Sequence, residues 1–180
     1  LLSAAIMETK SRIARFLSKI AISVTYPKAE MIVVPSKSSG DDLSLNYSIP
    51  SEKIRTIPNP LDIEKIIRAS KESSDVAFPD DGSFRIGFVG SLTREKNIQC
   101  LLKAVAILKE KKMSVRLFIL GAGDEKRGLE QLARELNIEE LVNFLGYREN
   151  PYAVMTNFDA LVVPSFFESF SYVALEAIVC

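Results

Sequence analysis

The sequence predicts an α/β protein whose parallel sheet is covered by helices on both faces. From residue 85 onward, short and nearly continuous apolar runs alternate with amphipathic stretches of helical length. Strands that are buried on both faces produce such runs, and the helices between them connect parallel strands. A glycine or a proline follows each run directly, which suits a sharp turn at the end of a strand. With 180 residues, 47% of them apolar, the chain can form a substantial core.

The elements from residue 85 to the end follow this alternation in order. The apolar runs predict four strands, at Arg85–Val89, Val115–Leu120, Val142–Leu145 and Ala160–Val163. The stretches between and after them predict helices at Ile98–Lys111, Asp124–Leu136 and Pro151–Thr156, and a last helix around Glu176. Asp124 suits the N-cap of the second of these helices. Because ligands bind at the carboxyl ends of the strands in such sheets, we expect the functional residues there.

The first part of the chain has fewer elements. Apolar residues predict short strands at Met31–Pro35 and Lys53–Ile57, with a short helix at Asp41–Tyr47 between them. Asn59 and Pro60 predict a turn. Residues 68–83 are rich in serine and aspartate, with a proline and a glycine, and predict a connection.

An amphipathic helix is predicted near the start, over residues 6–24. Its apolar face consists of Ile6, Ile13, Phe16, Leu17, Ile20 and Val24. Basic residues occupy other positions, so the helix could lie on an anionic membrane surface. A helix that covers a sheet has the same pattern, and we favour that interpretation.

Composition excludes several classes of function. The net charge is zero and the pI is about 6.6, so nothing indicates a nucleic-acid partner. Histidine is absent, which removes Ser-His and Cys-His catalysis and most zinc sites from this chain. Two distant cysteines indicate a reducing compartment, and no signal peptide or membrane span is evident. Since the chain starts at Leu1 and stops within a predicted helix, we interpret it as an internal fragment of a cytoplasmic protein.

The most informative pattern is a pair of acidic residues, Glu168 and Glu176, directly after the last predicted strand. A helix start there offers free N–H groups to an anion, and the carboxylates can accept hydrogen bonds from hydroxyls on either side of it. This combination fits a nucleotide-sugar. A glycosidase pair would need a separation of about 5–9.5 Å, whereas eight residues of continuous helix span about 12 Å. Two glutamates on a helix surface are a further alternative.

Two other features bear on phosphate binding. Lys96 stands at a helix start, where a cation is unfavourable unless an anion lies nearby; an exposed lysine is the alternative. Gly121 and Gly123 lack the third glycine of a dinucleotide fingerprint, because Lys126 occupies its position. The next predicted strand, about 20 residues later, does not end in the acidic residue that would bind the ribose, because Phe144, Leu145 and Gly146 stand there. These differences argue against a dehydrogenase that binds a dinucleotide.

These motifs, in this order and spacing, resemble the retaining GT-B glycosyltransferases of family 4. The segments that carry the resemblance are Ala29–Ser36, Ile57–Asp62, Phe88–Asn97, Ile119–Asp124, Asn143–Gly146 and Pro164–Ala177. The resemblance implies two Rossmann-like domains that face a cleft. Residues 1–62 would then be the end of the N-terminal domain and the interdomain crossing, 63–84 a connecting segment, and 85–180 the truncated nucleotide-sugar-binding domain.

The resemblance also implies roles for individual residues. Glu168 is similar to the glutamate that contacts the transferred sugar, Glu176 to the one that holds the ribose, and Lys96 to the lysine that neutralises the diphosphate. Backbone N–H groups at the helix start would face phosphate and sugar, and the backbone after Gly146 would meet the base. The resulting set of catalytic and donor-binding residues is Glu168, Lys96, Gly90, Ser91, Tyr147, Phe170, Ser171, Tyr172 and Glu176.

The implied reaction transfers a hexosyl-type sugar from a UDP- or GDP-sugar to a saccharide or lipid-linked acceptor, in polysaccharide or glycolipid synthesis. No cofactor or metal is expected, and the sequence has no Asp-x-Asp pair to chelate one. Ser91 stands where the family usually has an arginine, and serines replace the usual glycines at positions 169 and 171. A non-catalytic relative of the same fold is therefore an alternative. With most of the acceptor domain absent, we expect residues 1–180 alone to be inactive, and peripheral contact with the inner face of the membrane would involve residues 6–24.

Overall fold

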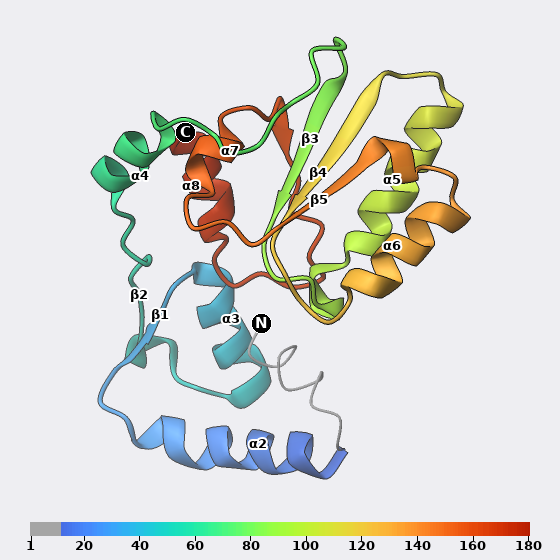
Figure 1. The fold of residues 1–180 in the computed structure, drawn as a ribbon. Helices are drawn as coiled ribbons and strands as arrows, with labels where there is room; N and C mark the ends of the chain where they lie inside the picture. Colours follow the sequence, from blue (N-terminus) through green and yellow to red (C-terminus); the bar gives the residue numbers. More distant parts are fainter. Residues whose placement is uncertain (1–11) are drawn as a thin grey trace. The chain divides into compact units, whose positions relative to one another are not determined.

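The computed structural model describes residues 12–180, which form two compact units. The first contains the residues up to Pro60 together with Phe167–Ser171. The second contains Leu61–Phe166 and Tyr172–Cys180. Each unit is described by itself (Figure 1).

The second unit is built on a four-stranded parallel sheet in the order β5-β4-β3-β6. Its strands are β3 (Phe84–Val89), β4 (Val115–Leu120), β5 (Val142–Gly146) and β6 (Ala160–Leu161). Helices α5 (Ile98–Glu110) and α6 (Lys126–Glu135) lie on one face of the sheet, and α4 (Ile63–Ser70), α7 (Tyr152–Met155) and α8 (Tyr172–Val179) gather on the other (Figure 1). Short 3-10 turns occur at η3 (Arg94–Lys96) and η4 (Glu139–Leu141). The predicted α/β class with a parallel sheet is confirmed.

Both faces of this sheet are buried. On one face, side chains of β3, β4, α5 and α6 form the main core, including Phe88, Leu102, Leu117, Ile119 and Leu129, each at most 2% exposed. On the other face, the ring of Phe118 packs against those of Phe78 and Phe158, with centroids 4.9 and 6.0 Å away. Gly87 leaves space for Phe158, because a Cβ there would lie 2.0 Å from that ring. The chain thus forms the two-sided core that its apolar runs predict.

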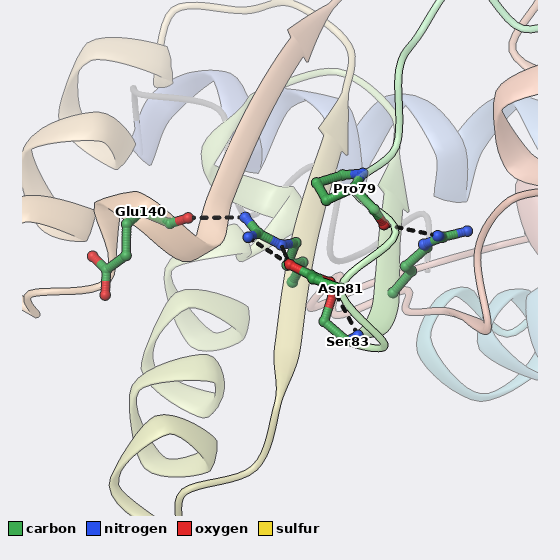
Figure 2. A network of polar contacts seen from close by, with 6 residues as sticks. Pro79, Asp81, Ser83 and Glu140 are labelled. Carbon is green, nitrogen blue, oxygen red and sulfur yellow. Dashed lines mark hydrogen bonds and ion pairs between the residues drawn. The ribbon is translucent and has the colours of Figure 1, made fainter.

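A polar network lies at the amino ends of the strands, opposite the ends where ligand binding is expected (Figure 2). Asp81 forms an ion pair of 2.6 Å with Arg116, whose guanidinium also donates to the carbonyl of Glu140. The backbone N–H of Ser83 donates to Asp81 over 3.1 Å. Hydrogen bonding from Ser83 and then from Arg116 lowers the pKa of Asp81 to about 2. The polar segment before β3 is therefore tied to β4 and η4.

The first unit is smaller. It contains α2 (Arg12–Thr25), η1 (Tyr26–Lys28), β1 (Ile32–Val34), α3 (Lys37–Tyr47), η2 (Ser51–Lys53) and β2 (Ile54–Thr56). The two strands pair in parallel, and a small cluster of Ile22, Val34, Leu43, Tyr47 and Ile49 forms the core. The side chain of Ser36 caps α3 by accepting from Ser39 N over 3.2 Å. None of the described helices has the length and apolar character needed to cross a membrane.

Several sequence predictions need correction. Helix α4 was not predicted, since residues 63–84 were assigned to a connecting segment. Helix α3 begins four residues before the predicted Asp41. Asp124 does not cap α6, which begins at Lys126 with Glu125 at the N-cap position and no side-chain hydrogen bond. Strand β6 ends at Leu161, two residues earlier than predicted.

The predicted apolar face of residues 6–24 is not covered in the described part of the helix. Phe16, Leu17, Ile20 and Val24 are 44–65% exposed, whereas Ile22 of the same helix belongs to the core. Within residues 12–180, these four side chains are therefore not covered by a sheet. Ile6 lies outside the described residues.

Candidate functional site

Hydrogen bonds join the loops at the carboxyl ends of β3, β4 and β5. Gly90 N donates to Leu120 O over 2.9 Å, and Gly121 N donates to Gly146 O over 2.8 Å. One step further, Leu92 N donates to Ala122 O over 2.9 Å. The pairing of the sheet thus continues past the strands into the loops. These loops form a fixed edge where the sequence predicts ligand binding.

Glycine is needed at two positions for this pairing. Gly121 has φ +142°, and a Cβ there would lie 1.8 Å from the carbonyl oxygen of Gly90. A Cβ at Gly123 would lie 2.4 Å from the carbonyl oxygen of Leu92. Both glycines therefore permit one loop to approach another, which gives them a structural role without a dinucleotide.

The loop after β3 carries Ser91 and Lys96 and is fastened to the segment after β6. Asn97 Nδ2 donates to Pro164 O over 3.1 Å, and Phe166 N donates to Glu95 O over 3.0 Å. Ser91 is exposed, whereas Lys96 is half-buried at the last position of η3, two residues before α5. Hydrogen bonding from Thr93 lowers the pKa of Glu95. The structure thus places the predicted phosphate-binding lysine at a helix start on an anchored loop.

The two acidic residues of the predicted donor site do not share one helix. Helix α8 begins at Tyr172, so Glu168 lies four residues before it and Glu176 is its fifth residue. Phe170 and Ser171 precede the helix. Both carboxylate residues are half-buried. The stretch 167–171 belongs to the first unit, while Tyr172 and Glu176 belong to the second.

Glu176 has a defined partner in the second unit. The hydroxyl of Tyr152 in α7 donates to Glu176 Oε1 over 3.1 Å. Burial, and then the negative charge of Glu176, raise the pKa of Tyr152, which keeps its hydroxyl protonated at neutral pH. Sequence reasoning missed Tyr152, because no motif links residues 24 positions apart.

The remaining predicted donor residue, Tyr147, directly follows Gly146, whose φ is +74°. Its side chain is 74% exposed. The next residue, Arg148, forms a 3.0 Å ion pair with Asp75. The backbone after β5 is thus turned outward by the glycine and held by a neighbouring ion pair.

A pocket of about 350 Å³ lies beside the loop after β3. It is lined by Thr93, Arg94, Asn97, Ile98, Gln99, Glu125, Leu129 and Phe166. Sequence reasoning did not predict it. The exposed aromatic residue after β6 and the charged residues at the starts of α5 and α6 are the signals that could have indicated it.

Comparison with known proteins places the chain in a family. Residues 70–180 match the family model of the glycosyl transferases group 1. The chain is 37% identical over 175 residues to the N-acetylgalactosamine-N,N'-diacetylbacillosaminyl-diphospho-undecaprenol 4-alpha-N-acetylgalactosaminyltransferase of Campylobacter jejuni, covering 97% of this chain and 46% of the relative. It is 34% identical over 165 residues to the D-inositol 3-phosphate glycosyltransferase of Corynebacterium jeikeium, covering 84% and 39%. The chain thus spans about half the length or less of these relatives.

Solved structures give the same fold. Anabaena Alr3699/HepE in complex with UDP has a TM-score of 0.73 and 21% identity, covering 95% of this chain and 48% of that one. The apo form of the lipopolysaccharide outer core galactosyltransferase WaaB has a TM-score of 0.68 and 25% identity, covering 88% and 43%. The architecture is therefore of the GT-B type. Together with the matched family model, this similarity establishes that the chain belongs to the glycosyl transferases group 1 family.

Proposed function

We propose that the chain supplies the nucleotide-sugar-binding part of a retaining, metal-independent glycosyltransferase of family 4. The observation that carries the proposal is the 37% identity to a transferase over 97% of the chain. The anchored lysine loop and the acidic residue within α8 support it, because both suit an activated sugar at the carboxyl end of the sheet.

The proposed chemistry is electrostatic. When the bond between the sugar and the diphosphate breaks, negative charge develops on the leaving phosphate. The ammonium group of Lys96 and the N–H groups of Phe170, Ser171 and Tyr172 would stabilise that charge without the reorganisation that water requires. In this proposal these groups neutralise the diphosphate without a metal ion, and Gly90 and Ser91 also belong to the donor-binding residues.

The two carboxylates have different proposed roles. Glu168 contacts the transferred hexosyl group and is required for transfer. Glu176 accepts hydrogen bonds from the ribose hydroxyls and is required for nucleotide affinity. The backbone at Tyr147 meets the edge of the base. Since the donor is a UDP- or GDP-sugar, these contacts fix it at both ends while its charged centre faces the cation.

The proposed acceptor is a saccharide on a lipid carrier, in polysaccharide or glycolipid synthesis. The similarity to an enzyme named for a diphospho-undecaprenol acceptor supports this class. We also propose cytoplasmic localisation with peripheral contact at the inner face of the membrane. The exposed apolar face of α2 supports that contact, as do five basic and no acidic residues between Lys10 and Ala29.

A thermal-shift experiment with UDP, GDP and NAD tests the proposal. We expect stabilisation by UDP or GDP, because a ligand that binds the native state raises its melting temperature. Stabilisation by NAD alone would indicate a dehydrogenase. If no nucleotide stabilises the chain, the second candidate is favoured, a non-catalytic scaffold of the same fold. Ser91, which stands where the family usually has an arginine, supports this candidate. Residues 1–180 alone are expected to transfer no sugar, and turnover by this chain would refute that part.

A further inference from the structure

We propose that Tyr152 is a positioning residue for the donor site: its hydroxyl orients the carboxylate of Glu176 so that the protein distinguishes ribose from 2'-deoxyribose. The inference rests on the proposed function, in which Glu176 holds the ribose hydroxyls. The inference adds Tyr152 to the donor site, although Tyr152 belongs to none of the sequence motifs and acts through Glu176.

The contact itself is well placed for this role. The Tyr152 hydroxyl and Glu176 Oε1 are 3.1 Å apart, both side chains are half-buried, and both helices belong to the second unit. A glutamate side chain has three rotatable bonds, and an unrestrained one must lose that freedom when it binds a ligand. A hydrogen bond to one carboxylate oxygen removes part of this cost before the ligand arrives.

The hydrogen bond leaves capacity for the ribose. An ionised carboxylate offers about four acceptor positions on its two oxygens. Tyr152 occupies one of them, so the neighbouring 2'- and 3'-hydroxyls of a ribose can still donate to the others. Burial and the charge of Glu176 raise the pKa of Tyr152, and the phenol remains a donor at neutral pH.

Tyr152 is in turn held by its own surroundings. Asn150 Oδ1 accepts from Tyr152 N over 3.1 Å at the start of α7. Asn150 Nδ2 donates to Ala69 O over 2.9 Å and to Glu72 Oε2 over 2.8 Å, at the end of α4. Helix α4 also contacts α7 and α8 directly. Three hydrogen bonds, linked through Asn150 and Tyr152, therefore connect the backbone of α4 to Glu176.

The test measures nucleotide affinity by titration calorimetry on the chain. The probe is UDP or GDP, whichever stabilises the chain more, together with its 2'-deoxy form. Tyr152→Phe keeps the ring and removes the hydroxyl, so the core of α7 is retained. We expect this variant to bind the ribonucleotide about three- to tenfold more weakly, because binding must then order the Glu176 side chain that Tyr152 no longer holds. Affinity for the deoxynucleotide should fall less, so the ratio of ribonucleotide affinity to deoxynucleotide affinity decreases.

Two further variants show whether Tyr152 acts through Glu176. Tyr26→Phe removes a tyrosine hydroxyl in the first unit and is the control, with no expected change in affinity. Glu176→Ala should weaken ribonucleotide binding and remove most of the discrimination. In that background, Tyr152→Phe should add little, because residues that act through one contact are not additive.

The outcomes separate this inference from the proposed function. If Glu176→Ala weakens binding but Tyr152→Phe does not, the inference fails and the proposed function stands. If Tyr152→Phe weakens both nucleotides equally, or weakens them also without Glu176, its role is structural and the inference fails. If the unaltered chain binds neither nucleotide, or Glu176→Ala has no effect, the proposed role of Glu176 fails and the inference fails with it.

Discussion

The packing of loop against loop at Gly121 leads to a strong prediction about stability. This residue directly follows β4 with φ +142°, and an added Cβ would lie 1.8 Å from the carbonyl oxygen of Gly90. The atom that is met belongs to the backbone, so no side-chain rotation can relieve the contact. The Gly121→Ala variant must therefore separate two loops that are joined by hydrogen bonds from Gly90 N and Gly121 N.

The expected change in the free energy of unfolding of Gly121→Ala is the sum of three contributions. A non-glycine residue at this positive φ costs about 1–3 kcal/mol. Forcing an extra methyl group into a packed position costs about 1–3 kcal/mol more. The alanine restricts the unfolded chain and returns about 0.4–1 kcal/mol. We therefore expect a loss of about 1–5.5 kcal/mol in the free energy of unfolding, which for a chain of this size lowers the melting temperature by at least about 2 °C.

The matched control is Gly128→Ala in α6. No atom lies within 4 Å of a Cβ built at Gly128, and its position is inside a helix. Alanine is favoured over glycine there by about 0.5–1 kcal/mol, so this variant should be slightly more stable. Thermal and urea unfolding followed by circular dichroism compare the two substitutions. A Gly121→Ala protein as stable as the Gly128→Ala protein would show that the loops separate freely, and would contradict the fixed edge described above.

Three further predictions concern charge and surface. In the complete enzyme, Glu168→Ala should abolish sugar transfer and leave nucleotide affinity largely intact, whereas Glu176→Ala should weaken nucleotide binding; equal effects on calorimetric affinity would contradict these roles. The pKa of Asp81 is lowered to about 2, so its contribution to stability is complete above pH 4 and is lost as the pH falls through 2. The difference in urea midpoint between the unaltered protein and Asp81→Asn should therefore shrink between pH 4 and pH 2, and a difference that stays constant over this range would contradict the lowered pKa. The chain should sediment with vesicles of anionic lipid. Ile20→Asp should lower its affinity for these vesicles about tenfold, because the apolar side chain is no longer buried in the lipid. If the unaltered chain does not bind anionic vesicles, the proposed membrane contact is excluded.

The sequence predicted the strands of the second unit because burial on both faces leaves a clear pattern. Val115–Leu120 matches β4 residue for residue. Five of its six side chains are buried, so nearly every position must be apolar. At the sheet edge the pattern is weaker, and β6 pairs in register with β3 through Ala160 and Leu161. One further hydrogen bond, from Val162 N to Gly87 O, follows the strand. The apolar run continues to Val163, beyond the paired residues, which explains why the predicted strand is too long.

The sequence of α4 contains a helix signal, although the connecting segment predicted for residues 63–84 includes this helix. Asp62 caps it by accepting from Lys65 N over 3.0 Å, and Ile63, Ile66 and Ile67 have helical spacing. Two turns give few repeats of the pattern, and the polar residues that follow indicated a connection. The error at Asp124 has another cause. Glu125 N donates to Leu92 O, so contact with another loop fixes the chain before α6.

The candidate site divides in the same way. Lys96, Glu168 and Glu176 were proposed from the sequence because they lie near a strand end or helix start and match motifs of the family that the chain resembles. Tyr152 and Asn150 were not, because their contacts depend on which helices meet on one face of the sheet. The order of residues in the sequence thus indicates the groups proposed to contact the ligand, whereas tertiary packing determines which groups are proposed to orient them.

The contacts that orient the proposed ligand-binding groups matter for how such a site can work. Electrostatic stabilisation is effective when charges and dipoles are fixed before the reaction, since reorganisation would cost what the interaction gains. In the second unit, Asn97 and Glu95 tie the lysine loop to the segment after β6, and Tyr152 ties Glu176 to α7. Each of these contacts is a hydrogen bond between groups of the protein itself. The groups proposed to hold the diphosphate and the ribose are therefore anchored by contacts outside the recognisable motifs, and a relative could keep every motif residue yet lose affinity by losing these contacts.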